Sequence, residues 1–129
     1  MAGFEWDKFY TLFKKDMGNE FTVGRYKQPK ESEYPYLDIN LSDNTGGHYD
    51  LGNCESSQTP MIEVTAYCNN YDDSKCYKAS MKAKKVMVSY GFQCITNPIK
   101  VDNADPAIAR WVSRYKRLFG SLDEIKKVN

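Results

Sequence analysis

The stretch from Pro60 to Phe92 constrains the fold most, because a strand pattern runs directly into a helix pattern. In its first part apolar and polar residues alternate, which is the period of a half-buried strand. The apolar row of this strand is Ile62, Val64, Ala66 and Cys68. From Ser74 to Tyr90 one helical stripe is apolar, and Gly91 follows where a left-handed helix stop costs little. The strand row and the helix stripe can cover each other, so the sequence predicts a small α+β domain.

A polar turn separates these two elements and sets the expected start of the helix. The residues between them favour turns, and Ser74 or Asp73 could cap the helix by accepting orphan backbone N–H bonds. The turn residues are Asn69, Asn70, Asp72 and Asp73.

Length and charge limit the classes of protein that this chain can belong to. At 129 residues it is expected to form one domain, which can bury a core without metal or disulfide staples. The formal net charge of +1 argues against non-specific binding to nucleic acid or to an anionic membrane. No apolar run approaches the roughly 20 residues of a membrane helix, and the first residues lack the basic and apolar regions of a secretion signal.

The four cysteines are expected to be reduced thiols, since nothing in the sequence indicates an oxidising compartment. They are Cys54, Cys68, Cys76 and Cys94. A zinc site that also uses His48 is the alternative, but no CxxC or HxxxH pair is present.

Four further elements are predicted from periodicity. A helix is expected over 4–17, and strands over 21–26, 34–41 and 92–101. The least regular segment is 42–59, in which Gly46-Gly47 suits a hairpin tip and His48–Leu51 suits a short returning strand. Such a segment is either a functional or assembly loop or a disordered one.

The segment 108–119 fits both a helix and a strand, with the local signals slightly favouring the helix because Asp105-Pro106 resembles a helix start. Residues 1–120 are expected to form the domain. Residues 121–129 are expected to be a loosely held polar tail.

No motif in the chain predicts catalysis, a cofactor or a metal. No GxSxG, EF-hand or phosphate-loop spacing is present, and a dyad of His48 with Cys54 has no other support. The basic and aromatic residues of 110–117 are the best nucleic-acid candidate. The two alternatives are core aromatics beside solvated cations, which is favoured, and arginines paired across a subunit boundary.

Three short signatures and their order resemble the tail terminator and tail-completion proteins of long-tailed bacteriophages and prophages. They are Tyr34–Ile39, then Ile62–Tyr67 with a helix closed by Tyr90-Gly-Phe92, and finally Asp105–Tyr115. The cysteines and the segment 42–59 match no signature of that family.

The resemblance implies a mixed or antiparallel sheet with two helices packed on one face, in the order α-β-β-(β)-β-α-β-β. It implies that 108–119 is the final strand, with Arg110 and Arg114 pointing the same way. It also implies a ring, usually hexameric, that caps the tail tube and contacts the tube protein and the head connector. The expected location is the virion tail or neck, and the host cytoplasm during assembly, with no membrane, small-molecule substrate or catalytic residue.

A ring needs a heterologous interface, in which one patch meets a different patch on the neighbour. The loops 27–33 and 42–59 and the sheet face without helices are the expected contact regions, and removal of 43–57 is expected to abolish assembly but not folding. The interface candidates are Arg25, Lys27, Tyr36, Asp38, His48, Tyr49, Glu63, Tyr67, Arg110 and Arg114. The alternatives are a head-completion or connector adaptor and, in another class, a small nucleic-acid-binding module.

Overall fold

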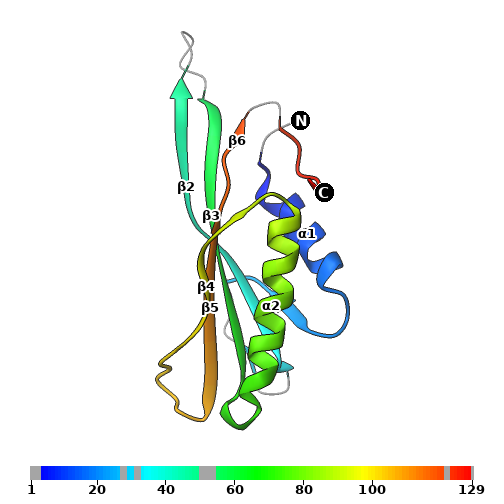
Figure 1. Ribbon diagram of the computed structural model, residues 1–129, viewed down its shortest axis with the longest axis vertical. Coiled ribbons are helices and arrows are strands. Elements are labelled where there is room, and N and C mark those ends of the chain that lie inside the picture. Colours follow the sequence, from blue (N-terminus) through cyan, green and yellow to red (C-terminus); the bar gives the residue numbers. More distant parts are fainter. Residues whose placement is uncertain (1–3, 27–28, 31–32, 50–54, 121–122, 129) are drawn as a thin grey trace.

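A computed structural model describes residues 4–26, 29–30, 33–49, 55–120 and 123–128, with only the backbone described for 44–49 and 55–57. The chain forms two helices and six strands in the described part (Figure 1). They are α1 (Trp6–Met17), β1 (Thr22–Gly24), β2 (Tyr36–Tyr49), β3 (Glu55–Asn69), α2 (Asp73–Ser89), β4 (Gln93–Val101), β5 (Ile108–Lys116) and β6 (Phe119–Gly120). A short 3-10 turn, η2 (Asn70–Asp72), joins β3 to α2.

The strands form one mixed sheet in the order β1-β2-β3-β5-β4, and β6 pairs with β3 beside this path. Strand β1 runs parallel to β2, and all other pairs are antiparallel. Both helices lie on the same side of the sheet in Figure 1. The predicted α+β class and the approximate order of the elements are therefore confirmed.

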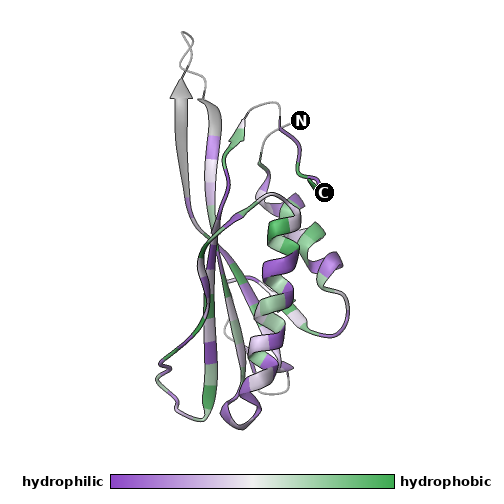
Figure 2. Ribbon diagram, in the orientation of Figure 1, coloured by the Kyte–Doolittle hydropathy of each residue, from purple (hydrophilic) through white to green (hydrophobic). Residues whose placement is uncertain are grey.

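The core lies between this sheet and the two helices. Helix α1 contributes Phe9 and Phe13, and α2 contributes the small residues Ala79 and Ala83, which let the helix approach the strands closely. The strand row predicted from alternation, Ile62 to Cys68, is buried in the same cluster. Each fully buried Phe or Ile side chain contributes about 1.5–3 kcal/mol, so this cluster is the main source of stability. Hydrophobic and hydrophilic residues accordingly alternate along α2 (Figure 2).

Helix α2 begins and ends almost where the sequence predicts. Gly91 has a φ of +84°, the left-handed conformation that ends the helix. The capping prediction was wrong, because the N-cap residue is Asp72 and it makes no side-chain cap hydrogen bond. Asp73 is instead the first helical residue, and its carboxylate accepts a hydrogen bond from Trp111.

Residues 108–116 form strand β5, as the family resemblance implies and against the local helix signals. Strand β5 pairs with β3 from Ile108↔Asn69 to Lys116↔Met61. Asp105-Pro106 does not begin a helix. The side chain of Asp105 accepts a hydrogen bond from the N–H of Ala107, and its carbonyl oxygen accepts one from the N–H of Ile108. These residues therefore form a turn that enters a strand.

The segment expected to be irregular, 42–59, belongs to a long β2–β3 hairpin. Gly46 and Gly47 are not its tip: they lie within β2, opposite Gln58 and Ser57. The expected returning strand at His48–Leu51 was also wrong for its first two residues, because β2 continues to Tyr49 and pairs there with Glu55. Residues 50–51 lie outside the described residues. Apolar alternation is absent from this segment because its strands leave the core, which removes the signal that predicts a strand.

Residues 123–128 pack onto the helices, in contrast to the loose tail expected for 121–129, of which 121–122 and 129 lie outside the described residues. Ile125 is buried, the N–H of Val128 donates to the carbonyl oxygen of Ser89, and Lys127 lies 3.6 Å from an Asp16 carboxylate oxygen. Neither helix in the described residues is long and apolar enough to span a lipid bilayer.

Candidate assembly surface

The sheet face opposite the helices carries a row of cross-strand polar pairs. Glu63 on β3 lies opposite Arg114 on β5, and Arg114 Nε donates to Glu63 Oε2 at 3.0 Å. Both side chains are partly exposed, so this ion pair contributes at most about 1 kcal/mol. Either side chain can therefore give up this contact for a charged group on another molecule at little cost in free energy.

Arg110 lies on the same face as Arg114, because every second residue of a strand points to the same side of the sheet. Its Nη2 donates to the carbonyl oxygen of Asp102 at 2.9 Å, and Tyr67 is its cross-strand partner. Burial, followed by the nearby charge of Asp38, raises the pKa of Tyr67 above its usual value. Arg110 and Arg114 therefore point the same way, as expected, and both already have polar partners within the protein.

Tyr36 and Asp38 lie on this face but are buried, with 1% and 5% of their surfaces exposed. Burial, with a smaller contribution from the charge of Asp38, raises the pKa of Tyr36 to about 12. The ring of Tyr36 lies against Gly24 of β1. Neither side chain offers a contact surface, so their role is to pack the β1–β2 edge of the sheet.

The side chain of Arg25 lies against α1, and so not on the sheet face opposite the helices. Its Nη1 lies 2.7 Å from an Asp7 carboxylate oxygen, and its guanidinium carbon lies 4.5 Å from the ring centre of Tyr10. Lys27 lies outside the described residues. His48 and Tyr49 are placed only by their backbone, near the outer end of β2. The nine described residues among the ten candidates are thus distributed over the sheet face, the α1 edge and the hairpin.

The hairpin is the least covered part of the described chain. In Figure 1 its two strands extend past the ends of both helices. Strand β1 pairs with β2 only at Tyr36–Asp38, and Tyr26 satisfies backbone groups of Leu41 and the side chain of Asn40. From residue 43 to residue 49, no described strand pairs with the outer edge of β2.

No family model matches the chain, and no curated protein matches it.

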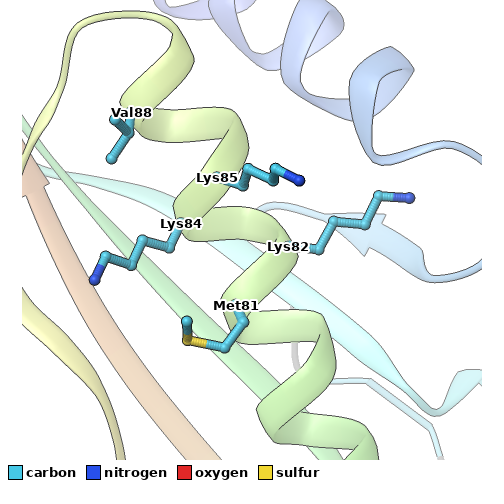
Figure 3. Close-up of a pocket in the computed structure, with 5 residues that line it drawn as sticks. All are labelled: Met81, Lys82, Lys84, Lys85 and Val88. Carbon is cyan, nitrogen blue, oxygen red and sulfur yellow. The ribbon is translucent and has the colours of Figure 1, made fainter.

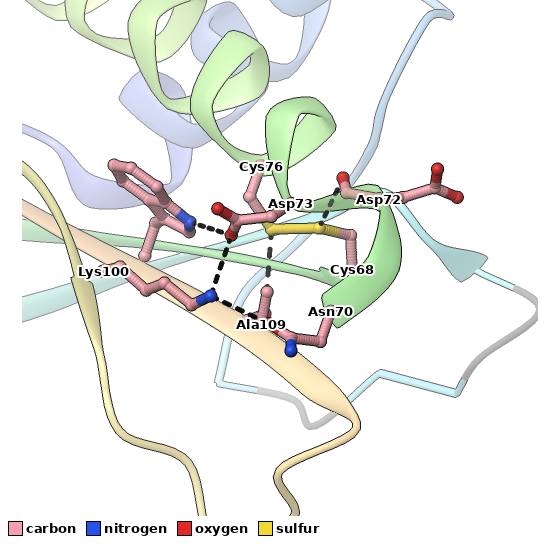
Figure 4. Close-up of polar contacts among 8 residues, drawn as sticks. Cys68, Asn70, Asp72, Asp73, Cys76, Lys100 and Ala109 are labelled. Atoms are coloured by element: carbon pink, nitrogen blue, oxygen red, sulfur yellow. Dashed lines mark hydrogen bonds and ion pairs between the residues drawn. A yellow bond between two sulfur atoms is a disulfide. The ribbon is translucent and has the colours of Figure 1, made fainter.

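Two of the four cysteines are joined. Cys68 at the end of β3 and Cys76 in the first turn of α2 form a disulfide, with their Cα atoms 6.0 Å apart (Figure 4). The expectation of reduced thiols was therefore wrong for this pair. Both residues lie on the core side of consecutive elements joined by a short turn, which is the signal in the sequence that could have indicated the bridge. Cys94 is free and half-buried, and Cys54 lies outside the described residues.

A polar network that the sequence did not indicate surrounds the start of α2 (Figure 4). Trp111 Nε1 donates to Asp73 Oδ1 at 2.7 Å, and Lys100 Nζ lies 3.6 Å from the same oxygen. Lys100 also donates to Asn70 Oδ1 at 2.8 Å. The network links β4, β5 and α2. Its residues are far apart in the sequence, so local sequence patterns do not predict it.

Ionised side chains and a strand edge are the polar features that these surfaces carry. The described residues contain no group of three His, Cys, Asp or Glu side chains placed to hold a metal ion. Trp111 is partly buried and its ring N–H is bound by Asp73, and the nearby Arg110 and Arg114 have internal partners. These contacts weaken the nucleic-acid hypothesis. A partly exposed ion pair and an uncovered strand edge suit contacts with another protein chain.

Proposed function

We propose that this protein is a structural assembly protein of a phage tail, of the tail-terminator kind, that forms a ring on the tail tube and joins it to the head connector. The observation that carries this proposal is the projecting β2–β3 hairpin with its free strand edge. A two-stranded hairpin is at best marginally stable by itself in water, so a protein that keeps one outside its core has a use for it at a contact.

The composition of the free edge supports this role. Residues 44–49 of β2 contain no Pro, Lys or Arg, and these are the residues with which proteins usually block unwanted strand pairing. The hairpin edge is thus open to main-chain pairing with a neighbour.

The opposite edge of the sheet shows the contrast. Strand β4 contains Pro98 and Lys100, and its register with β5 shifts twice, between Cys94 and Thr96 and between Thr96 and Ile99. These features discourage strand addition at β4. Strand β2 has a register shift of its own, between Leu41 and Asp43, but residues 44–49 beyond it lack the proline and lysine that β4 carries. The two edges therefore differ, as the two patches of a heterologous contact do.

A register-matched shortening of the hairpin tests the proposal. Replacing residues 48–56 by Asn-Gly keeps the Gly47↔Ser57 pair and both β3 partners of β6, Ser57 and Gln58. The described strand residues that are removed, 48–49 and 55–56, pair only with each other's strand at the outer end of the hairpin. We therefore expect an unchanged circular dichroism spectrum and loss of the ring in sedimentation velocity.

Two results would count against this. A shortened chain that still assembles would show that the hairpin is not the contact. A shortened chain that unfolds would show that the hairpin is part of the folding core. The signals of Trp6 and Trp111 in near-ultraviolet circular dichroism report on the fold at both helices.

A further inference from the structure

The outward side of α2 carries a surface groove of about 610 Å³. The residues lining it are Met81, Lys82, Lys84, Lys85 and Val88 (Figure 3). Met81 and Val88 project to one side of the helix with Lys84, and Lys82 and Lys85 project toward α1. The groove therefore combines apolar side chains with a lysine rim.

The apolar residues of this groove belong to a stripe on α2 that is exposed and lies apart from the buried stripe of the same helix. Tyr77, Met81 and Val88 follow helical spacing and are 48%, 38% and 42% exposed. The core stripe of the same helix is separate and includes Ala79, Ala83 and Met87. A helix with a second, exposed apolar stripe has surface available for a partner.

The groove is also strongly unbalanced in charge. Among the described residues, its lining holds three lysines and no acidic side chain, in a chain whose formal net charge is only +1. Asp16 lines the neighbouring hollow with Lys82 and Lys85, and it already pairs with Lys127. Lys82 lies 3.8 Å from a Glu20 carboxylate oxygen in an exposed and therefore weak ion pair. Lys84 donates to the neutral Asn97, and Lys85 has no ion-pair partner among the described residues. An incoming carboxylate would thus meet cations that are only weakly compensated.

We propose that this groove binds an acidic amphipathic segment of a partner protein. An apolar side chain of the segment sits against Met81 and Val88, and flanking carboxylates meet Lys82, Lys84 and Lys85. The charge complementarity selects an acidic partner, and the apolar contact selects one with a hydrophobic face. The proposal is independent of ring formation, since a monomer carries the same groove.

The test uses a fluorescein-labelled helical peptide of glutamate with leucine at every third or fourth position, and its fluorescence anisotropy. The groove variant is Lys84→Gln/Lys85→Gln. The matched control is Lys75→Gln/Lys78→Gln, which removes the same charge from the same helix outside the groove. We expect roughly tenfold weaker binding for the groove variant, about 1.4 kcal/mol, and less than about a twofold change for the control.

A third variant separates the apolar contact from the charge. Met81→Gln should weaken binding severalfold without changing its dependence on salt, because it removes no charge. Equal weakening by both lysine variants would overturn the proposal, since it would indicate general attraction to a basic helix. Absence of peptide binding, or tighter binding of a labelled single-stranded oligonucleotide, would also overturn it.

Discussion

Gly24 and Tyr36 meet at the β1–β2 edge, where the tyrosine ring takes the space that a side chain on residue 24 would need. A Cβ added to Gly24 would lie 2.8 Å from Tyr36 Cζ, well inside van der Waals contact. Gly24 has no positive φ, so its requirement is space rather than backbone freedom.

We therefore expect Gly24→Ala to lower the free energy of unfolding by about 1–3 kcal/mol through overpacking. Gly120→Ala is the matched control. A Cβ added to Gly120 would have Asp123 Oδ2 as its nearest atom outside the adjacent residues, at 3.5 Å, which is an ordinary contact. Urea unfolding of both variants measures the difference. Equal stability of the two variants would contradict the packing that the structure gives to Tyr36.

The hydroxyl of Tyr36 gives a prediction for alkaline pH. It is buried without a hydrogen-bond partner among the described protein atoms, and its pKa is raised to about 12, against about 10 in an unfolded chain. The neutral phenol is therefore favoured in the folded state. Its contribution is complete below pH 10 and is lost as the pH rises from 10 toward 12, because the unfolded chain ionises first.

Tyr36→Phe should consequently lose less stability between pH 8 and pH 11 than the unaltered protein. The comparison is urea unfolding at the two pH values, with Tyr71→Phe as the control because that ring is 82% exposed. If Tyr36→Phe and Tyr71→Phe behave alike, Tyr36 is not buried as a neutral phenol.

At the scale of elements, the Cys68–Cys76 bridge fixes the junction between β3 and α2. Closing a loop of sequence separation 8 restricts the unfolded chain and stabilises the fold by about 2–3 kcal/mol in the chain-entropy description. Reduction of the bridge should lower the melting temperature.

The measurement is thermal unfolding with and without dithiothreitol, with Cys76→Ala as the control that should not respond to the reductant. Alkylation followed by mass measurement identifies the cysteines in each form. A melting temperature that dithiothreitol does not change, with Cys68 and Cys76 alkylated before reduction, would show that the bridge is absent.

Periodicity predicted those elements whose side chains reach the core. The alternation of Ile62 to Cys68 predicted the C-terminal half of β3, and the stripe ending before Gly91 predicted α2. The outer hairpin was missed because its strands leave the core and lose alternation. Local signals also misjudged β5, because pairing with β3 on one side and β4 on the other outweighs intrinsic propensity.

The candidate surface was only partly visible in the sequence for a similar reason. The two-residue period of a strand predicts that Arg110 and Arg114 point the same way. It does not predict that Arg114 pairs with Glu63, because the two residues are 51 positions apart in the sequence. The burial of Tyr36 and Asp38 depends on β1 and on neighbouring side chains, which the alternation within β2 does not reveal.

At the scale of the whole molecule, the described chain is a two-layer domain with three surfaces of different kinds. The helix side carries the lysine groove, the opposite sheet face carries the Glu63–Arg114 ion pair, and the hairpin carries a free strand edge. Distinct surfaces are what a heterologous contact needs, since each copy must offer a different patch to each neighbour.

The mass of the assembled protein tests the central claim most directly. Native mass measurement over a range of protein concentrations should show monomer in equilibrium with one closed species of fixed stoichiometry, for which we expect six copies. Because a ring has no free ends, no larger species should grow as the concentration rises. A protein that stays monomeric at every concentration, or that forms an open series of increasing masses, would contradict the proposed ring.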